Sequence, residues 1–478
     1  MAEHDGYHSP LSGRYASLQM QEIWSQQRKI RTWRRLWLAL AQSEQELGLP
    51  ITDKQIDQLK AHLDDIDFEA AAKYEQELRH DVMAHVHVLG DAAPLARPII
   101  HLGATSQFVN CNTELLQLRE AMGVIAGKLA LVISNLGTFA KKYRALPTVG
   151  FTHFQPAQPT TVGKRATLWA QELALTLEDL EFRMSTLRFR GVRGATGTQA
   201  SFLDLFEGDQ EKVMQLDSLV TTKMGWDINK RFTVTGQTYP RIVDAHILSS
   251  LASIAAAAHK CATDLRLLAN RGEVEEPFEQ KQIGSSAMAY KRNPMRCERV
   301  CALARIVMNL PANALQTAAV QWMERTLDDS ANRRISLPES FLALDGMLDV
   351  LGNVTDGLIV YEKRVQANLL KEMPFLATER LIMEAVKNGA DRQDAHEVVR
   401  AHAIEVARCI KEEAAENDLL ERLGKESMFA GIDLASSTDP STFIGLAAEQ
   451  VDAFVQEVVD PIRSKYKDSP TQIAQLRV

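Results

Sequence analysis

Three segments in the middle of the chain carry apolar residues at alternating spacings of four and three positions. This heptad spacing drives long helices to pack side by side along a narrow apolar seam, so it strongly constrains the fold. The seam positions are Leu118, Met122, Ile125, Leu129, Val132, Leu136 and Phe139, then Leu173, Leu177, Leu180, Met184 and Leu187, then Ile247, Leu251, Ile254, Ala258, Cys261, Leu265 and Leu268. Strand signals are sparse elsewhere, and the pattern therefore predicts an all-α protein.

A fourth segment has similar spacing at Leu344, Leu348, Leu351 and Leu358, and we expect it to form a helix that is interrupted at Thr355. Helices of about 25 to 30 residues would be about 40 Å long, which is long for one globular subunit. The long helices could form a bundle within one chain or a bundle shared between subunits. Their length favours the shared bundle.

The chain has 478 residues, which allows roughly three domains. Pro338 and the region of Val360 and Tyr361 offer breaks in the helical pattern. We expect a helical N-terminal domain, a central domain of long helices and a helical C-terminal domain. Their predicted ranges are 1–106, 107–360 and 361–478.

The formal net charge is −8, which argues against a general affinity for nucleic acid or for an anionic membrane. It leaves open a small anionic ligand held by a few arginines.

The five cysteines are odd in number and form no C-x-x-C pair, so we expect reduced thiols. Neither a signal-peptide pattern nor a run approaching 18 apolar residues is present, so we expect a cytoplasmic protein that does not bind membranes.

Polar residues gather in the loops between the predicted helices, and the loop at residues 282–294 is the most informative. It holds small residues, two serines, a lysine and an asparagine close to Gly284. Backbone N–H groups near Gly284 could face an oxyanion, with Lys291 adding charge and Asn293 adding a donor. Composition alone also fits an ordinary exposed loop.

The same loop reads G-S-x-x-M-x-x-K-x-N from Gly284 to Asn293, and this resembles the signature of the fumarase/aspartase superfamily. Its members eliminate across a C–N or C–O bond and release fumarate or a close relative. The resemblance implies a three-domain helical fold whose central bundle is shared in a homotetramer. It also implies that Ser285 is the catalytic base, with Lys291 and backbone dipoles favouring its ionised form. Ala289 replaces a proline of many relatives, which removes no chemical group.

Two further motifs contain histidine. The run T-H-F-Q-P-A-Q around His153 resembles the T-H-x-Q-x-A-Q region of the superfamily, which implies that His153 is the general acid for the leaving nitrogen.

The run R-H-D-V-M-A-H-V-H at residues 79–87 could bind zinc by residue type, but it lacks the i,i+4 pair of a helical zinc site. It resembles adenylosuccinate lyases instead, which implies that His80 assists catalysis while Arg79 and Asp81 contact substrate. Spacing does not decide which histidine is the acid.

Three other stretches also resemble the adenylosuccinate lyase family, and its animal type in particular. They are S-P-L-S-G-R-Y at Ser9–Tyr15, T-V-T-G-Q-T-Y at Thr233–Tyr239 and Q-W-M-E-R-T-L-D-D-S-A-N-R-R at Gln321–Arg334. The resemblance covers essentially the whole chain. It implies elimination of fumarate from adenylosuccinate, giving AMP, and from succinyl-aminoimidazole carboxamide ribotide, giving AICAR, in purine biosynthesis. It implies neither a metal nor an organic cofactor.

Such a substrate carries two carboxylates and a phosphate, so several guanidinium groups are expected around it. By resemblance, the phosphate and ribose are held by Arg14, Tyr15, Arg325, Ser330 and Arg334. The succinyl part is held, by the same resemblance, by Thr105, Ser106, Gln237, Lys291, Asn293 and Arg299. The resemblance also implies that each active site takes residues from three subunits.

Other functions stay open from the sequence. One is a different fumarate-releasing lyase such as argininosuccinate lyase, and the arginines and serine that follow Trp322 argue against it. Another is a non-catalytic structural protein of the crystallin type, and the presence of His153, Ser285 and Lys291 argues against that. A helical scaffold that binds partners would not explain why polar motifs gather in the loops.

Overall fold

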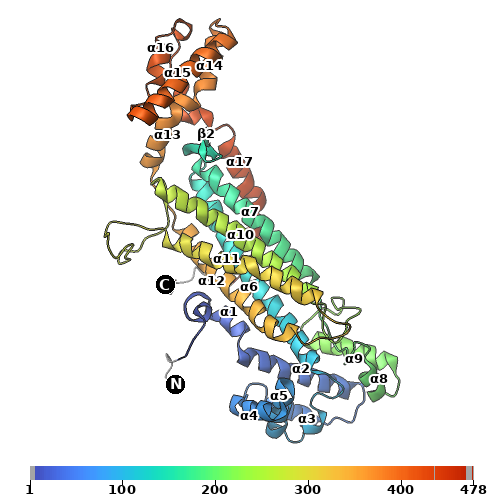
Figure 1. Cartoon of the computed structure of the whole chain (residues 1–478). Helices are drawn as coiled ribbons and strands as arrows, with labels where there is room; N and C mark the ends of the chain where they lie inside the picture. The colour runs from blue at the N-terminus through green and yellow to red at the C-terminus, as the bar shows by residue number, and fades with distance from the viewer. Residues whose placement is uncertain (1–5, 435, 470–475, 477–478) are drawn as a thin grey trace.

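The computed structural model describes residues 6–434, 436–469 and 476, and the chain forms an elongated, mostly helical molecule (Figure 1). The prediction of an all-α, multi-domain fold is confirmed. Five long helices run along one another in a central bundle, with shorter helices at each end. The central helices are α6 (Ser106–Lys142), α7 (Val162–Thr186), α10 (Ile242–Asn270), α11 (Met295–Ala319) and α12 (Asp329–Asp356).

One end of the bundle is covered by the N-terminal helices together with two short helices inserted between α7 and α10. These are α2 (Gln26–Glu46), α3 (Asp53–Ala61), α4 (Phe68–Leu78), α5 (Asp81–Ala92), η2 (Arg97–Ile99), α8 (Ala200–Leu205) and α9 (Gln210–Lys223). Before them in the chain, η1 (Leu11–Tyr15) and α1 (Leu18–Ile23) lie along the side of the bundle against α12.

The opposite end carries a small helical unit with its own apolar core. Its helices are α13 (Glu362–Leu376), α14 (Thr378–Lys387), α15 (Arg392–Glu413), α16 (Leu419–Gly424) and the short turns η3 (Ser427–Phe429), η4 (Ser436–Thr438) and η5 (Pro440–Phe443). The chain then returns to the bundle, where α17 (Ala447–Phe454), η6 (Val455–Val459) and α18 (Asp460–Lys465) lie against α6 and α7. Part of the predicted C-terminal domain therefore packs with the central helices.

The three predicted seams lie along α6, α7 and α10, and nearly all of their apolar side chains are buried. Leu187 lies just beyond the end of α7. The longest helix, α6, has 37 residues, which makes it about 55 Å long at about 1.5 Å per residue. The heptad pattern therefore identified three of the five central helices correctly.

The prediction for the fourth segment was wrong in three details. The helix α12 continues through Thr355 and ends at Asp356, so Leu358 lies outside it, and Pro338 lies inside the helix instead of breaking it. Pro311 lies inside α11 in the same way. A proline inside a helix removes one hydrogen bond and favours a kink. Packing of long neighbouring helices on both sides keeps these two helices continuous.

The sparse strand signals in the sequence did not predict the two small strand pairs that the structure contains. The strands β1 (Pro147–Thr152) and β2 (Gln155–Thr161) form an antiparallel hairpin, whose two-residue turn is His153 and Phe154. A second small pair joins β3 (Val274–Glu275) to β4 (Ile359–Val360). The hairpin was missed because its prolines and glutamines hide the alternation that marks a strand.

By length and composition alone, α6 and α10 would also be suited to crossing a membrane. In the structure, 67% of the most apolar window of α6 and 56% of that of α10 are buried inside the protein. Burial of this extent is typical of helices in the core of a folded domain.

Glu44 on α2 is a buried acid, and neither of its carboxylate oxygens has a hydrogen-bond partner within the described residues. Burial raises the pKa of Glu44 to about 9 from its ordinary value of 4.5, because the charged form is poorly solvated there. The folded chain therefore binds one more proton than the unfolded chain between these two pH values. As a consequence, the contribution of Glu44 to the free energy of unfolding falls as pH rises through this window.

We expect Glu44→Gln to increase the free energy of unfolding by about 1–3 kcal/mol at pH 7, because glutamine has the same shape but does not ionise in the unfolded chain. Thermal unfolding at several pH values between about 5 and 8.5 measures the effect, and the stability gap between variant and wild type should widen with pH. The exposed Glu22 provides the control, since Glu22→Gln should show no widening gap. A gap for Glu44→Gln that does not depend on pH would contradict the assignment.

Candidate functional site

The amino-terminal ends of α5, α6 and α12 meet at one end of the bundle. His80 Nε2 lies 3.1 Å from Ser106 Oγ, and Arg334 Nη2 donates to Asp81 Oδ2 at 2.8 Å. Helix N-termini present backbone N–H groups and the positive end of the helix dipole, both of which favour bound anions. The structure therefore brings together predicted residues from three distant stretches of sequence in a setting suited to an anionic ligand.

His80 is oriented by its position at the start of α5. Its Nδ1 accepts a hydrogen bond from the backbone N–H of Met83 at 3.4 Å, as an N-cap side chain does. In a neutral imidazole the other nitrogen then carries the proton, so His80 Nε2–H donates to Ser106 Oγ. The exposed ring is thus presented as a donor beside the end of α6.

Thr105 occupies the N-cap of α6, but its side chain makes no capping bond. Its Oγ1 is buried and has no hydrogen-bond partner in the described part of the chain. Buried hydroxyls are normally bonded, and an N-cap threonine normally accepts from the helix backbone. The arrangement of Thr105 and Ser106 therefore suits a ligand oxygen at the end of this long helix.

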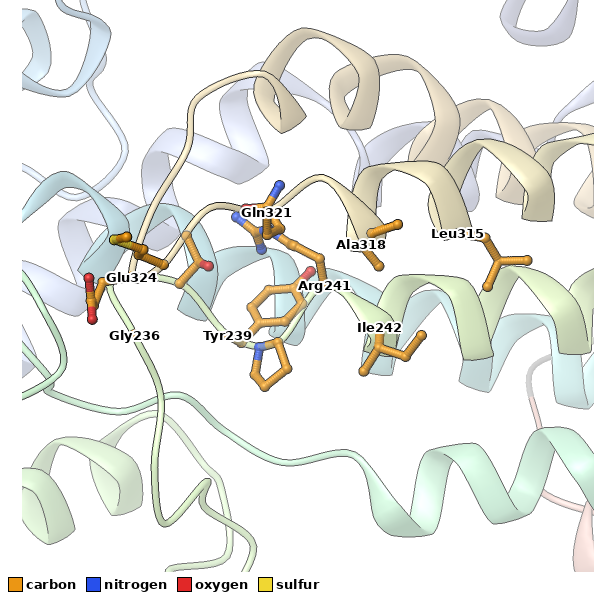
Figure 2. A pocket seen from close by; sticks show the side chains of 12 residues that line it. Gly236, Tyr239, Arg241, Ile242, Leu315, Ala318, Gln321 and Glu324 are labelled. Atoms are coloured by element: carbon orange, nitrogen blue, oxygen red, sulfur yellow. The ribbon is translucent and has the colours of Figure 1, made fainter.

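The predicted phosphate residues Arg325 and Ser330 lie at the start of α12, close to the stretch that contains Gln237. The backbone N–H of Gln237 donates to the carbonyl of Glu324 at 3.0 Å, and Arg325 Nη1 donates to Asp329 Oδ1 at 2.7 Å. A pocket of about 510 Å³ lies between the start of α10 and the end of α11. Its lining includes neighbours of Gln237 and of Arg325, such as Gly236 and Glu324 (Figure 2). The stretch around Gln237, predicted to bind the succinyl part, and the stretch around Arg325, predicted to bind the phosphate, are thus neighbours in space.

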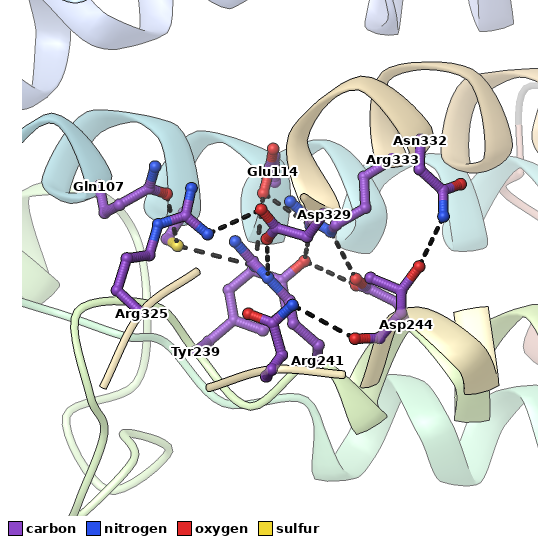
Figure 3. A network of polar contacts seen from close by, with 12 residues as sticks. Gln107, Glu114, Tyr239, Arg241, Asp244, Arg325, Asp329, Asn332 and Arg333 are labelled. Carbon is purple, nitrogen blue, oxygen red and sulfur yellow. Dashed lines mark hydrogen bonds and ion pairs between the residues drawn. The ribbon is translucent and has the colours of Figure 1, made fainter. Parts of the chain in front are cut away.

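A buried network of charges underlies this region (Figure 3). Arg333 donates to Asp244 at 2.7 Å and to Glu114 at 2.8 Å, while Arg241 donates to Asp329 at 2.7 Å. Burial alone would raise the pKa of Glu114, but Arg333 and then Arg241 outweigh it and lower that pKa. No role was predicted for these residues from the sequence. Glu114, Arg241 and Asp244 are isolated charged residues, which usually lie on a solvated face, and Asp329 and Arg333 lie in the Gln321–Arg334 stretch without a predicted contact.

Lys29 is a further residue that sequence reasoning missed. Burial lowers the pKa of Lys29, and the positive charge of Arg334 lowers it further, while Asp81 and Glu114 act in the opposite direction. Lys29 Nζ also lies 4.9 Å from the ring centre of Trp33. The lysine belongs to the basic run R-K-I-R-T-W-R-R. Such a run is typical of a solvent-exposed helix face, so the local sequence does not distinguish Lys29 from its neighbours.

The loop with Ser285 lies between the end of α10 and the start of α11, beside the bundle in Figure 1. Ser285 Oγ accepts hydrogen bonds from the backbone N–H groups of Ala287 at 3.3 Å and Met288 at 3.1 Å. Two donors directed at this oxygen stabilise a negative charge on it. The backbone therefore favours the ionised serine, whereas the side chain of Lys291 is exposed to solvent.

The fold of this loop depends on Gly284. A Cβ atom at this position would collide with the carbonyl oxygen of Lys291. Asn293 Nδ2 donates to the carbonyl of Gly284 at 2.8 Å and closes the loop from the other side. The glycine and the asparagine of the motif therefore shape the loop around Ser285.

The base of the loop is fixed by buried charges that the sequence analysis did not identify. Glu276 accepts from the backbone N–H groups of Arg296 at 3.0 Å and Cys297 at 2.9 Å, at the first turn of α11. Arg296 in turn donates to Glu279 at 2.7 Å. A carboxylate at a helix N-terminus is favourable, so this arrangement anchors both ends of the loop.

His153 lies at the tip of the hairpin of β1 and β2, with its side chain exposed. The turn residues His153 and Phe154 have φ angles of 52° and 58°, as a type I′ turn requires. Residues other than glycine, asparagine and aspartate are unfavourable in this conformation. Next to the turn, the Arg271 guanidinium lies 4.7 Å from the ring centre of Phe151. A strained turn thus presents the histidine to solvent.

These groups do not form one site within a single chain. Ser106 begins α6 and His153 follows its end, and these are separated by 37 helical residues, or about 55 Å. Likewise, Ser285 precedes α11 and Arg325 follows it, across 25 helical residues, or about 37 Å. In Figure 1, the hairpin that includes β2 lies toward one end of the bundle, and α5 lies at the other end.

The remaining predicted residues lie at several places. Tyr15 ends the turn η1, and its carbonyl packs against Gly346 in the middle of α12, while Arg14 beside it is exposed. Arg79 is the exposed C-cap residue of α4. Arg299 is half-buried in the second turn of α11. One chain therefore does not gather the predicted nucleotide-binding residues into a single group.

The histidines that follow His80 have separate surroundings. The ring of His85 packs edge-on to Trp33, with ring centres 5.6 Å apart, and burial lowers the pKa of His85 to about 4. His87 stacks on Tyr74 at 5.1 Å. Among the described residues, no three His, Cys, Asp or Glu side chains are grouped so that they could hold a metal ion.

Comparison with known proteins identifies relatives along nearly the whole chain. Residues 6–309 match the lyase family model, and residues 374–454 match the model for the adenylosuccinate lyase C-terminus. Adenylosuccinate lyase of Schizosaccharomyces pombe is 53% identical over 99% of this chain and 98% of that protein. The Saccharomyces cerevisiae enzyme is 53% identical over 96% of each chain.

Solved structures with lower sequence identity have the same fold. The fumarate lyase from Mesorhizobium sp. BNC1 is 23% identical, with a TM-score of 0.79 over 95% of this chain and 100% of that chain. The 3-carboxy-cis,cis-muconate lactonizing enzyme from Pseudomonas putida is 23% identical, with a TM-score of 0.82 over 96% and 99%. From the identity and coverage of the curated relatives, together with both family models, the chain belongs to the adenylosuccinate lyase family.

Proposed function

We propose that this protein is an adenylosuccinate lyase, which releases fumarate from adenylosuccinate to give AMP. The same site would cleave succinyl-aminoimidazole carboxamide ribotide to give AICAR, because only the base portion of the substrate differs. The observation that carries the proposal is the set of cations at the N-terminal end of α12, next to Thr105 and Ser106. Arg325 and Arg334 offer forked donors to a phosphate, and Ser330 lies in the first turn of α12, where the helix N-terminus also favours an anion. A nucleotide substrate requires such a phosphate site.

The proposed reaction begins at Ser285. Its ionised Oγ removes a proton from the carbon next to a carboxylate, and the electron pair left behind is delocalised into that carboxylate. Donors such as Thr105, Ser106 and Asn293 would bind the carboxylate as its negative charge increases. The C–N bond then breaks as His153 gives a proton to the leaving nitrogen. The products are fumarate and the amine, and the steps use only protein groups.

His80 and His153 would then have different roles. His80 is held by the backbone of α5 and by Ser106, which suits a group that orients the substrate or donates a hydrogen bond to it. His153 lies on an exposed hairpin tip, which suits a group that reaches a site formed with another subunit. This division favours His153 as the acid.

A homotetramer with shared active sites completes the proposal. Its first support is the separation of Ser285 and His153 from the groups at the other end of the bundle. Its second support is on α7, where Leu168, Leu175 and Phe182 are exposed at intervals of seven residues. An exposed apolar stripe at heptad spacing suits packing against a helix of another subunit. We place this enzyme in the cytoplasm, without a nucleic-acid or membrane partner.

The test is a substrate panel on the purified protein. Absorbance and product analysis should show fumarate and AMP released together from adenylosuccinate, and no turnover of argininosuccinate. Turnover of argininosuccinate alone would keep the family chemistry but overturn the proposed substrate. Absence of turnover on every succinyl substrate, from a folded tetramer, would favour a structural protein instead.

A further inference from the structure

Asp329 lies at the centre of the contacts that surround Arg325. Its side chain is fully buried at the first residue of α12. One carboxylate oxygen accepts from Arg325 Nη1 at 2.7 Å, and the other accepts from Arg241 Nε at 2.7 Å (Figure 3). Asp329 therefore bridges a partly exposed arginine and a buried one.

The buried arginine is itself fixed on several sides. The Arg241 guanidinium lies 4.6 Å from the ring centre of Tyr239, and Nη1 lies 3.9 Å from Glu114. Glu114 is held in turn by Arg333 at 2.8 Å. Arg241 is thus held by contacts on several sides. Asp329 connects this fixed arginine to Arg325 and so restricts the orientations that the Arg325 side chain can adopt.

The charge on Asp329 is also secured by this network. Burial alone would raise the pKa of Asp329, but Arg241, followed by Arg325 and Arg333, outweighs it and lowers that pKa. The group is therefore ionised at neutral pH and accepts charge-assisted hydrogen bonds, which are the strong kind.

Arg325 needs such support if it binds a ligand. A free arginine side chain loses considerable rotamer entropy when it is immobilised. Here Nη1 is committed to Asp329, while the guanidinium has further N–H donors on its other nitrogens, and 16% of the side chain is exposed. A guanidinium fixed along one edge can present another edge to a phosphate without that entropy loss.

We propose that Asp329 is a positioning residue, which holds the Arg325 guanidinium in the orientation that binds the substrate phosphate. The inference rests on the proposed function, because it assigns the phosphate to Arg325. It predicts a defect in phosphate binding that is separate from any general effect on folding. Asp329 acts through Arg325 and does not itself touch the substrate.

The experiment measures the affinity of the full-length protein for AMP and for fumarate by calorimetry, in wild type and in Asp329→Asn. We expect the Kd for AMP to rise about tenfold, as expected when a charge-assisted hydrogen bond is weakened, and the Kd for fumarate to stay within twofold. Equal weakening of both ligands, or of neither, would overturn the proposal.

Asp217 provides a matched control, because it is another buried carboxylate between two arginines. It accepts from Arg231 at 2.8 Å and lies 3.3 Å from Arg193, and neither arginine is predicted to bind substrate. Asp217→Asn should leave the Kd for AMP within twofold. An AMP defect of the same size in this control would show that any damaged ion pair has this effect, and it would overturn the specific role of Asp329.

A charge-conserving variant keeps the inference testable if Asp329→Asn does not fold, since removing one partner of a buried ion pair is strongly destabilising. Asp329→Glu retains the charge but moves the carboxylate, so the Kd for AMP should rise by about threefold, less than in Asp329→Asn. An unchanged Kd for AMP in Asp329→Glu would count against positioning.

A double-mutant cycle tests whether Asp329 acts through Arg325. In the Arg325→Ala background, Asp329→Glu should cause no further loss of AMP affinity, because the residue to be positioned is gone. Fully additive losses would overturn the mechanism. A wild-type protein that binds no AMP and cleaves no adenylosuccinate would overturn the proposed function and this inference with it, whereas an unaffected Asp329 variant would overturn the inference alone.

Discussion

Replacement of Ser285 by alanine is expected to lower kcat for fumarate release by about 10²–10⁴-fold, as loss of a general base does. Ser285 Oγ is the atom toward which the backbone N–H groups of Ala287 and Met288 are directed. Alanine keeps the loop backbone but removes the oxygen that is proposed to take the proton. KM should change little, since the arginines proposed to bind the phosphate lie elsewhere. Steady-state kinetics with adenylosuccinate measure both constants.

The neighbouring Ser286 is the control for this prediction, because it is a serine in the same loop with an exposed side chain. Ser286→Ala should retain kcat within about threefold. If both variants lost activity equally, the loop as a whole would be the sensitive element. If Ser285→Ala retained full kcat, the base would have to be another group.

Recovery of activity from two inactive variants is the second large effect that we expect. His153→Ala and Ser285→Ala should each be nearly inactive as pure proteins. When they are unfolded together, refolded and reassembled, some sites should receive both native residues from different subunits. With random assembly of equal amounts, about a quarter of the sites should be native if the two residues come from different chains.

A His153→Ala/Ser285→Ala double variant, mixed with Ser285→Ala alone, is the control for reassembly. No site in that mixture contains a native serine, so activity should not return. Absence of recovery in the main experiment, from tetramers shown to contain both variants, would contradict the shared site. It would then place His153 and Ser285 in the same chain's site.

The helical fold could be predicted from one sequence pattern, the heptad spacing of apolar residues. The seams of α6, α7 and α10 were identified because burial along a long helix requires apolar residues at a spacing near 3.5. The same reasoning did not detect α11, where Pro311 and small buried residues such as Cys297, Cys301 and Ala304 break up the apolar stripe. Packing against α10 and α12 holds that helix in place, and such packing has no local sequence signal.

The chemical motifs were also found from local sequence, because the groups that form a loop lie next to one another in the chain. The sequence predicted an anion-binding loop in which Asn293 is a donor, whereas in the structure Asn293 Nδ2 donates to the carbonyl of Gly284 and closes the loop. The hairpin under His153 was not foreseen, since its two-residue turn uses residues that rarely adopt a positive φ. Only the pairing of β1 with β2 fixes that conformation.

The sequence by itself therefore determined the helical class and most of the long central helices, and it supplied the candidate reactive side chains, because each depends on residues close together in the chain. The tertiary structure decided which groups meet. It joined Asp81 to Arg334 and His80 to Ser106, and it buried Asp329 between Arg241 and Arg325. It also separated Ser106 from His153 by the length of α6. Contacts and separations of this kind arise from the packing of whole helices, which no local pattern of residues specifies.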